Sequence, residues 1–427
     1  MRNLLLAAAG LLVTAAECAS AQPSPEPLTL ADCIRMAQSA PSPVSLARQE
    51  RDIAARETTK ARAGFLPQSR LVNGFIYNSP LLYNREMFSH LPLNGIREYA
   101  FLFGVDQEFD TSGRLRADLT RARVARDLAG ASLAMTERDL KRAVTTAYYR
   151  ALLTRRIARI VQDALAESQV FEKRTKLLFG GGEAAQADVV KASAQTAFLE
   201  QALNAAELEA TLASQELASF WTREVAEPLA LAEILDGDPP APESPATLPA
   251  PFLKRLEFNL LEAQRRGFQA DARRARADLL PQLGAAFQYG LDSTAVRIRD
   301  RGYAAFVNLT ITIFDWNKAR AAIQQARLKA EQVETSRAIS ERAFSAEYQS
   351  ALARVKRLFE QISLTRRQAK LAEDDLRLSR IRYEGGEGLA LDVVTSQNQQ
   401  AQARTNYYTT MANYLNARAD LEVASGR

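Results

Sequence analysis

Hydrophobic residues follow a period of two in four separate segments, which predicts four β-strands. Apolar side chains alternate with polar or small ones around residues 71–77, 99–109, 283–291 and 303–313. In the third segment, Phe287, Tyr289 and Leu291 are separated by Gln288 and Gly290. This alternation is typical of a strand with one apolar and one polar face. Strands of about 9–12 residues can cross a bilayer when tilted.

Very long helices are expected after each pair of strands. Residues 111–179 and 316–383 contain no proline and are rich in Ala, Leu and Arg. At ~1.5 Å per residue, each segment would form a helix of roughly 100 Å. Glycines then end each helix, and return helices are expected at about 184–220 and 389–425. The segment between the first two strands, about 79–98, is expected to be a loop.

The same landmarks occur twice in the same order, about 200 residues apart. Phe65–Gln68 has its counterpart in Leu279–Gln282, and the glycine turn at 180–182 has its counterpart at 385–386. This duplication predicts one elongated structure built from two similar halves. The expected organisation is a signal peptide at 1–21, a first repeat at 22–222, a proline-rich inter-repeat or equatorial segment at 223–251, and a second repeat at 252–427.

The first residues have the pattern of a secretory signal peptide. Arg2 precedes the apolar run 4–13, and small residues at 19–21 form a cleavage site. No later run of 18 or more apolar residues occurs. A membrane-spanning part would therefore have to be a β-barrel.

The two cysteines of the chain, Cys18 and Cys33, bear on lipidation and on disulfide formation. Cys18 permits lipidation of the chain, although Glu17 fits a lipidation signal poorly. If cleavage follows residue 21, Cys33 alone remains, so no internal disulfide can form. The helical spacing around Cys33 favours a buried thiol.

Composition and motifs argue against disorder, nucleic-acid binding and catalysis. Hydrophobic residues make up 47% and charged residues 25%, and the net charge of +5 is spread along helical segments. The one histidine, His90, lies in a predicted loop, and neither a zinc-type Cys/His spacing nor a phosphate-binding glycine loop is present. Asp110 and Asp315 directly follow strands, where a carboxylate can cap the next helix. We therefore expect no enzyme activity, no metal and no cofactor.

The order and duplication of these motifs resemble the TolC-like outer-membrane efflux protein family. The most specific segments are Ala61–Gln68, its counterpart Ala275–Gln282, and Tyr383–Gly388 followed by Leu391–Val394. The resemblance covers nearly all of the mature chain. It implies a mainly α fold with membrane β-structure, in which a homotrimer forms a twelve-stranded β-barrel, four strands per chain, continuous with a long α-helical barrel. Independently of the family, four strands cannot close a barrel in lipid, so the chain would have to oligomerise.

The resemblance also implies a function and partners. Family members lie in the outer membrane of Gram-negative cells and extend into the periplasm. They are passive channels of tripartite efflux or type I secretion systems, driven by an inner-membrane pump of the RND or ABC type through a periplasmic adaptor (membrane fusion protein). The sequence indicates neither the exported cargo nor the class of pump.

Candidate functional residues lie near the tips of the helical hairpins. Tyr383 and Asp392 match the family's tip tyrosine and one of its entrance aspartates, and Asp188 is the counterpart of Asp392 in the first repeat. A helix dipole also favours an aspartate in a first turn, which is a structural alternative for both. Gly388 and Thr395 stand where the family carries charged residues, so the bonds that close the gate are expected to differ. The tip glycines are expected to form the surface that docks the adaptor: Gly180, Gly181, Gly182, Gly385, Gly386 and Gly388.

Two other classes of protein explain part of the sequence pattern or none of it. A periplasmic adaptor or coiled-coil scaffold without a pore would account for the long helical hairpins equally well. It would not need amphipathic strand pairs. A secreted enzyme would need a catalytic constellation, which the sequence does not offer.

Overall fold

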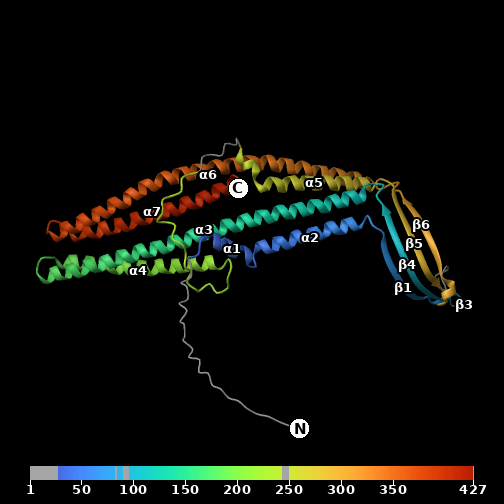
Figure 1. Ribbon diagram of the computed structural model, residues 1–427, viewed down its shortest axis with the longest axis horizontal. Helices are drawn as coiled ribbons and strands as arrows, with labels where there is room; N and C mark the ends of the chain where they lie inside the picture. The colour runs from blue at the N-terminus through green and yellow to red at the C-terminus, as the bar shows by residue number, and fades with distance from the viewer. Residues whose placement is uncertain (1–26, 82–83, 90–95, 243–249, 427) are drawn as a thin grey trace, which may run out of the picture.

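The computed structural model describes residues 27–81, 84–89, 96–242 and 250–426. The molecule is elongated, with a sheet at one end and the tips of two helical hairpins at the other (Figure 1). The predicted signal peptide, Cys18 and His90 lie outside the described residues. Among the described residues, no helix is both long and apolar enough to cross a membrane.

Four antiparallel strands form the sheet, in the order β1-β4-β5-β6. The four predicted strands are confirmed: β1 (Gln68–Tyr77), β4 (Arg97–Phe109), β5 (Gln282–Ser293) and β6 (Gly302–Thr310). The last strand ends three residues earlier than predicted, because its partner β5 begins with Gln282, directly opposite Thr310. The prediction of a loop at 79–98 was wrong in part. This segment contains a short hairpin, β2 (Pro80–Leu81) and β3 (Asn84–Ser89), whose few apolar residues give no clear period of two.

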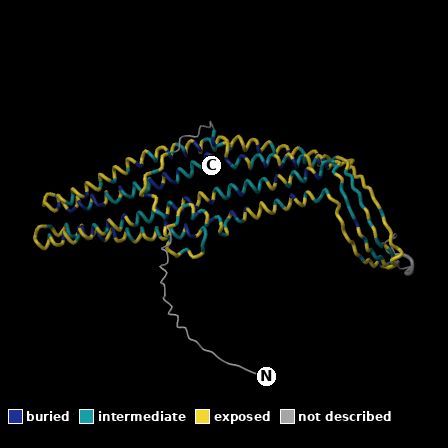
Figure 2. Tube along the Cα trace, in the orientation of Figure 1, coloured by how far each residue is buried: buried dark blue, intermediate teal, exposed yellow. Residues whose placement is uncertain are grey.

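Strand register separates an apolar from a polar face, as the alternation predicted. Phe103 lies opposite both Leu71 and Tyr289, so these large side chains share one face. On the other face Arg70 pairs with Asp106, with their Nη1 and Oδ2 atoms 3.1 Å apart. Many apolar residues of the sheet are exposed in the single chain. Figure 2 colours most of the two outer strands, β1 and β6, as exposed. Burying this apolar face therefore requires a lipid or protein surface.

Seven α-helices make up most of the described chain. They are α1 (Leu30–Ser39), α2 (Pro43–Ala63), α3 (Arg114–Gly180), α4 (Gln186–Ala218), α5 (Leu256–Ala277), α6 (Lys318–Glu384) and α7 (Ala390–Ala424). Short 3₁₀ turns η1 (Pro251–Lys254) and η2 (Ile298–Asp300) complete the order. Helices α3 and α6 each have 67 residues, and they form hairpins with α4 and α7 respectively. The same order of elements thus occurs in both halves of the chain: helix, strand, strand, long helix and return helix.

The two long helices begin slightly later than predicted. Gly113 (φ 82°) and Asn317 (φ 63°) adopt left-handed backbone conformations and turn the chain before each helix. Asp110 Oδ1 still accepts a hydrogen bond from the amide of Leu115, at 2.9 Å. Asp315 accepts the equivalent bond from Ala319, also at 2.9 Å. Both carboxylates thus satisfy a free amide of the first helical turn from outside the N-cap position.

The core of the molecule lies where the segment after α4 crosses the helices. Tyr148 is fully buried on α3, and its hydroxyl donates to carbonyl oxygens of Leu28 and Ala232 at 3.2 and 3.1 Å. Asp236 binds Arg156 of α3 and the hydroxyl of Tyr408 on α7. The crossing segment therefore ties the two hairpins together at mid-length.

Cys33 of α1 belongs to the same core. It is completely buried and free, as predicted. Burial raises the pKa of its thiol to about 11, so the thiol stays protonated and unreactive near neutral pH.

Candidate functional site

Both hairpin tips turn on a glycine with a left-handed backbone. Gly182 has φ 80° and Gly386 has φ 79°, a conformation that only glycine adopts without strain. The amide of Glu183 then donates to Leu178 O at 2.8 Å, and that of Glu387 donates to Arg382 O at 2.9 Å. These bonds satisfy the last carbonyls of α3 and α6. All six glycines predicted for adaptor docking lie at these two turns, at the end of the molecule opposite the sheet (Figure 1).

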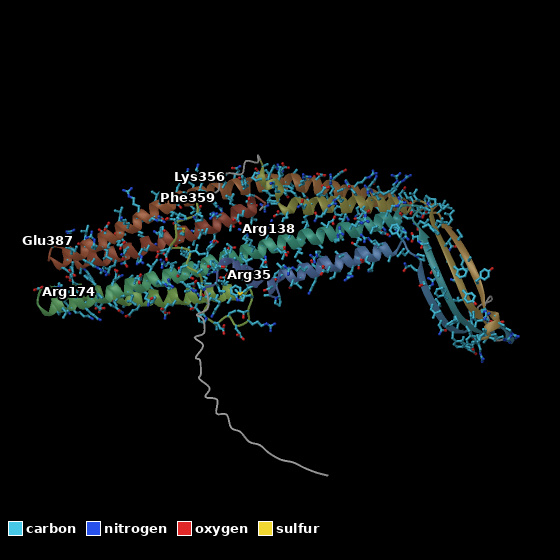
Figure 3. All side chains as sticks on the ribbon, viewed as in Figure 1. Arg35, Arg138, Arg174, Lys356, Phe359 and Glu387 are labelled. Carbon is cyan, nitrogen blue, oxygen red and sulfur yellow. The ribbon has the colours of Figure 1, made fainter. Side chains whose placement is uncertain are left out.

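Gly388 allows the second tip to close tightly. It directly follows Glu387, which is labelled at this tip in Figure 3. A Cβ atom at position 388 would lie 3.0 Å from the amide nitrogen of Tyr383 and 3.2 Å from the carbonyl carbon of Arg382. The loop therefore packs directly on the last turn of α6. A residue with a side chain would force the two to move apart by a few tenths of an ångström.

A small apolar core joins the two hairpins just behind their tips. Tyr383 of α6 is buried, and its ring lies 5.1 Å from that of Phe171 on α3. The remaining members of this tip core are Ala192, Leu376, Ala390 and Val393, with Leu178 and Val394 packed against it. Tyr383 therefore lies between the hairpins, where packing against Phe171 opposes their separation.

The two candidate aspartates lie at the start of the return helices. Asp392 is exposed, and its Oδ2 accepts a hydrogen bond from the amide of Leu389 at 3.3 Å. Asp188 is partly buried in the first turn of α4. The hydroxyl of Thr395 donates to Leu391 O within α7, at 2.8 Å. Asp392 thus has a local capping role in the single chain, in addition to any role at an entrance.

Two polar links between the hairpins were not predicted from the sequence. Arg380 of α6 lies 2.8 Å from Glu167 of α3. Gln195 of α4 and Asn398 of α7 exchange two amide hydrogen bonds, at 2.7 and 3.3 Å. The two pairs are separated by 213 and 203 residues in sequence, so no local pattern could have found them.

Buried polar atoms without a partner also gather here. Gln397 is 2% exposed, and neither its Nε2 nor its Oε1 has a hydrogen-bond partner among the described residues. The hydroxyl of Tyr383 is buried and unpaired in the same sense. Such groups carry a desolvation cost, typically about 1–3 kcal/mol each. The packing of the tips is therefore less stable than its apolar contacts alone would make it.

The described residues contain no group of three His, Cys, Asp or Glu side chains that could hold a metal ion. The polar groups at the tips form pairwise links between helices. Their geometry is suited to holding two hairpins together.

Comparison with known proteins decides the family. The sequence profile described as outer membrane efflux protein matches residues 36–223 and 254–427. The chain belongs to the outer membrane efflux protein family. The predicted resemblance is thereby confirmed, and the chain is an outer-membrane channel protein for efflux. A search of the curated proteins finds no match.

Solved structures of this family share the fold. The outer membrane channel CmeC of Campylobacter jejuni is 14% identical with a TM-score of 0.80, over 93% of this chain and 85% of that chain. VceC of Vibrio cholerae is 16% identical with a TM-score of 0.79, over 93% of this chain and 96% of the VceC chain. MtrE of Neisseria gonorrhoeae, solved in an open state, is 19% identical with a TM-score of 0.80, over 93% and 88%. The predicted TolC-like fold, long helices continuous with membrane strands, is confirmed.

Proposed function

We propose that three copies of this outer membrane efflux protein assemble into a passive duct. The observation that carries the proposal is the sheet: β1 and β6 are its edges, and its apolar face is uncovered in the single chain. Unpaired backbone groups at both edges would be costly in lipid. Pairing β6 of one copy with β1 of the next removes both edges, and three copies of four strands make a closed barrel of twelve.

Exposed leucines on α6 support assembly along the helices as well. Leu364, Leu371 and Leu378 recur every seven residues and are 64%, 58% and 51% exposed. The first two line a groove of about 870 Å³ between α6 and α7. A seven-residue spacing suits packing against a long helix, here one from a neighbouring copy.

The hairpin tips are the gate in this proposal. Hairpin α6–α7 would move away from α3–α4, which breaks the Arg380–Glu167 link and opens the tip core. Three copies each of Asp392 and Asp188 would surround the entrance, where a ring of negative charge attracts cations. Tyr383 would hold the closed position through its packing on Phe171.

The duct would work as the outer-membrane part of a tripartite efflux or type I secretion system. An inner-membrane pump of the RND or ABC type would supply the energy, and a periplasmic adaptor would dock on the glycine tips. The bare backbone at Gly180–Gly182 and at Gly385, Gly386 and Gly388 permits close approach of adaptor helices.

Conductance tests the proposal. Mature protein purified in detergent and added to a planar bilayer should give discrete current steps. The double variant Glu167→Gln/Arg380→Gln should raise the open fraction. Absence of current from protein that has inserted would contradict the duct.

A further inference from the structure

A basic groove lies at the junction of helices and sheet, at the far end of the molecule from the tips. Its volume is about 400 Å³. Its basic members are Arg116, near the start of α3, and Arg273 and Arg276, near the end of α5. The other lining residues are Ser112, Gly113, Ala117, Thr120, Ala277 and Leu280. Three guanidinium groups thus line one groove.

The positive charge of this groove is only partly neutralised. Arg116 Nε donates to Asp110 Oδ2 at 2.7 Å. Within the described part of the chain, neither Arg273 nor Arg276 has a carboxylate within 4.0 Å, whereas Arg274 between them pairs with Asp118 at 2.5 Å. Three guanidinium groups and one carboxylate leave a formal charge of +2. The positive end of the α3 dipole adds to it.

The groove faces the same side as the apolar face of the sheet. Phe109 pairs with Leu283 on that face, whereas Glu108 lies on the polar one. Arg114 Nε donates to Glu108 Oε1 at 2.9 Å. The side of α3 that carries Arg114 therefore lies on the same side of the molecule as the polar face of the sheet. Arg116, two residues further, lies about 200° around the helix. It therefore points to the side that faces lipid.

The groove also lies at the depth where headgroups are expected. Leu280 precedes the first residue of β5 by two positions, and Ser112 follows the last residue of β4 by three. The apolar band of the sheet thus ends where the groove begins. Because β4 and β5 are the central strands, a neighbouring copy joined at β1 or β6 would leave this surface open.

We propose that this groove binds the phosphate group of an anionic phospholipid in the periplasmic leaflet. Arginine matches phosphate geometry with two parallel hydrogen bonds, and Arg273 and Arg276 have donors free for them. The acyl chains would lie on the apolar face beside Phe109 and Leu283. The proposal rests on the outer-membrane location and is independent of the gate and the adaptor.

Lipid selectivity tests the site. Native mass spectrometry of the detergent-purified protein should show preferential retention of phosphatidylglycerol over phosphatidylcholine with the same acyl chains. The variant R273Q/R276Q should lower this preference about 25-fold, since each basic residue near an anionic surface contributes about fivefold. The control R354Q/R367Q removes two exposed arginines of α6, roughly 50 Å or more from the sheet, and should keep the preference.

The outcomes distinguish a phospholipid site from a site for free anions. Equal retention of both lipids by the unmodified protein would overturn the proposal, even if the glutamine variant fails to fold. Unchanged selectivity in R273Q/R276Q would also overturn it, as would an equal loss in R354Q/R367Q. Displacement of the lipid by millimolar inorganic phosphate would reassign the groove to free anions. Retained selectivity in R273K/R276K would support charge recognition.

Discussion

Glu167 on α3 and Arg380 on α6 lie 213 residues apart in sequence and form an ion pair of 2.8 Å between the two helical hairpins. Both side chains are about one-third exposed. The pair lies one turn from the contact of Phe171 with Tyr383. Charge, ring packing and an amide pair thus join the hairpins within a short distance of their tips.

Removing this ion pair should loosen the tips. A partly exposed pair contributes about 0.5–1 kcal/mol, so Glu167→Gln should raise the open-to-closed ratio about two- to fivefold. Single-channel open probability measures this ratio. Arg357→Gln, which breaks a pair with Glu360 inside α6, is the matched control and should leave it unchanged. An equal effect of both variants would remove the pair from the gate.

The tip glycines should respond according to their backbone conformation. Gly386→Ala places a side chain at φ 79°, which costs about 1 kcal/mol and should increase hydrogen exchange around the second tip. Gly180→Ala is the control, because Gly180 has no positive φ and its added methyl meets nothing within 4 Å. If both variants exchange alike, the left-handed turn does not control tip stability.

Asp392 should set the charge of the entrance. Asp392→Ala removes one negative charge from each copy, so block by multivalent cations in planar bilayers should weaken. Glu373→Gln removes an exposed carboxylate on the neighbouring helix α6, away from the tip, and should not change the block. Unchanged block in Asp392→Ala would leave this residue with its helix-capping role alone.

Stability should fall in acid through Glu257, at the start of α5. Burial alone would raise the pKa of this carboxyl, but hydrogen bonds from Arg255 and Arg138 outweigh burial and lower it to about 2, from 4.5. Its stabilising contribution is therefore complete above about pH 4.5 and is lost as pH falls toward 2. Urea unfolding followed between pH 6 and 2 measures this loss. The Glu257→Gln variant should have a lower free energy of unfolding near neutral pH, and this free energy should change less with pH than in the unmodified protein.

Local alternation was sufficient to predict the four strands of the main sheet, and the long helices followed from two proline-free segments rich in Ala, Leu and Arg. Phe103 and Tyr289 could be assigned to one face before their pairing was known. The left-handed turns at Gly113 and Asn317 carry no such periodicity, so the helix starts were misplaced by two or three residues. The links of Arg380 and Gln195 depend on how distant helices pack, which no single segment encodes.

The number of copies in one particle tests the central claim most directly. In the duct, β1 and β6 of different copies pair, because neither edge is satisfied in a lone chain within lipid. Mass measurement of the mature protein in detergent should give three chains per particle, and the same particles should conduct ions after reconstitution. A stable monomer that remains in solution without detergent would contradict the account.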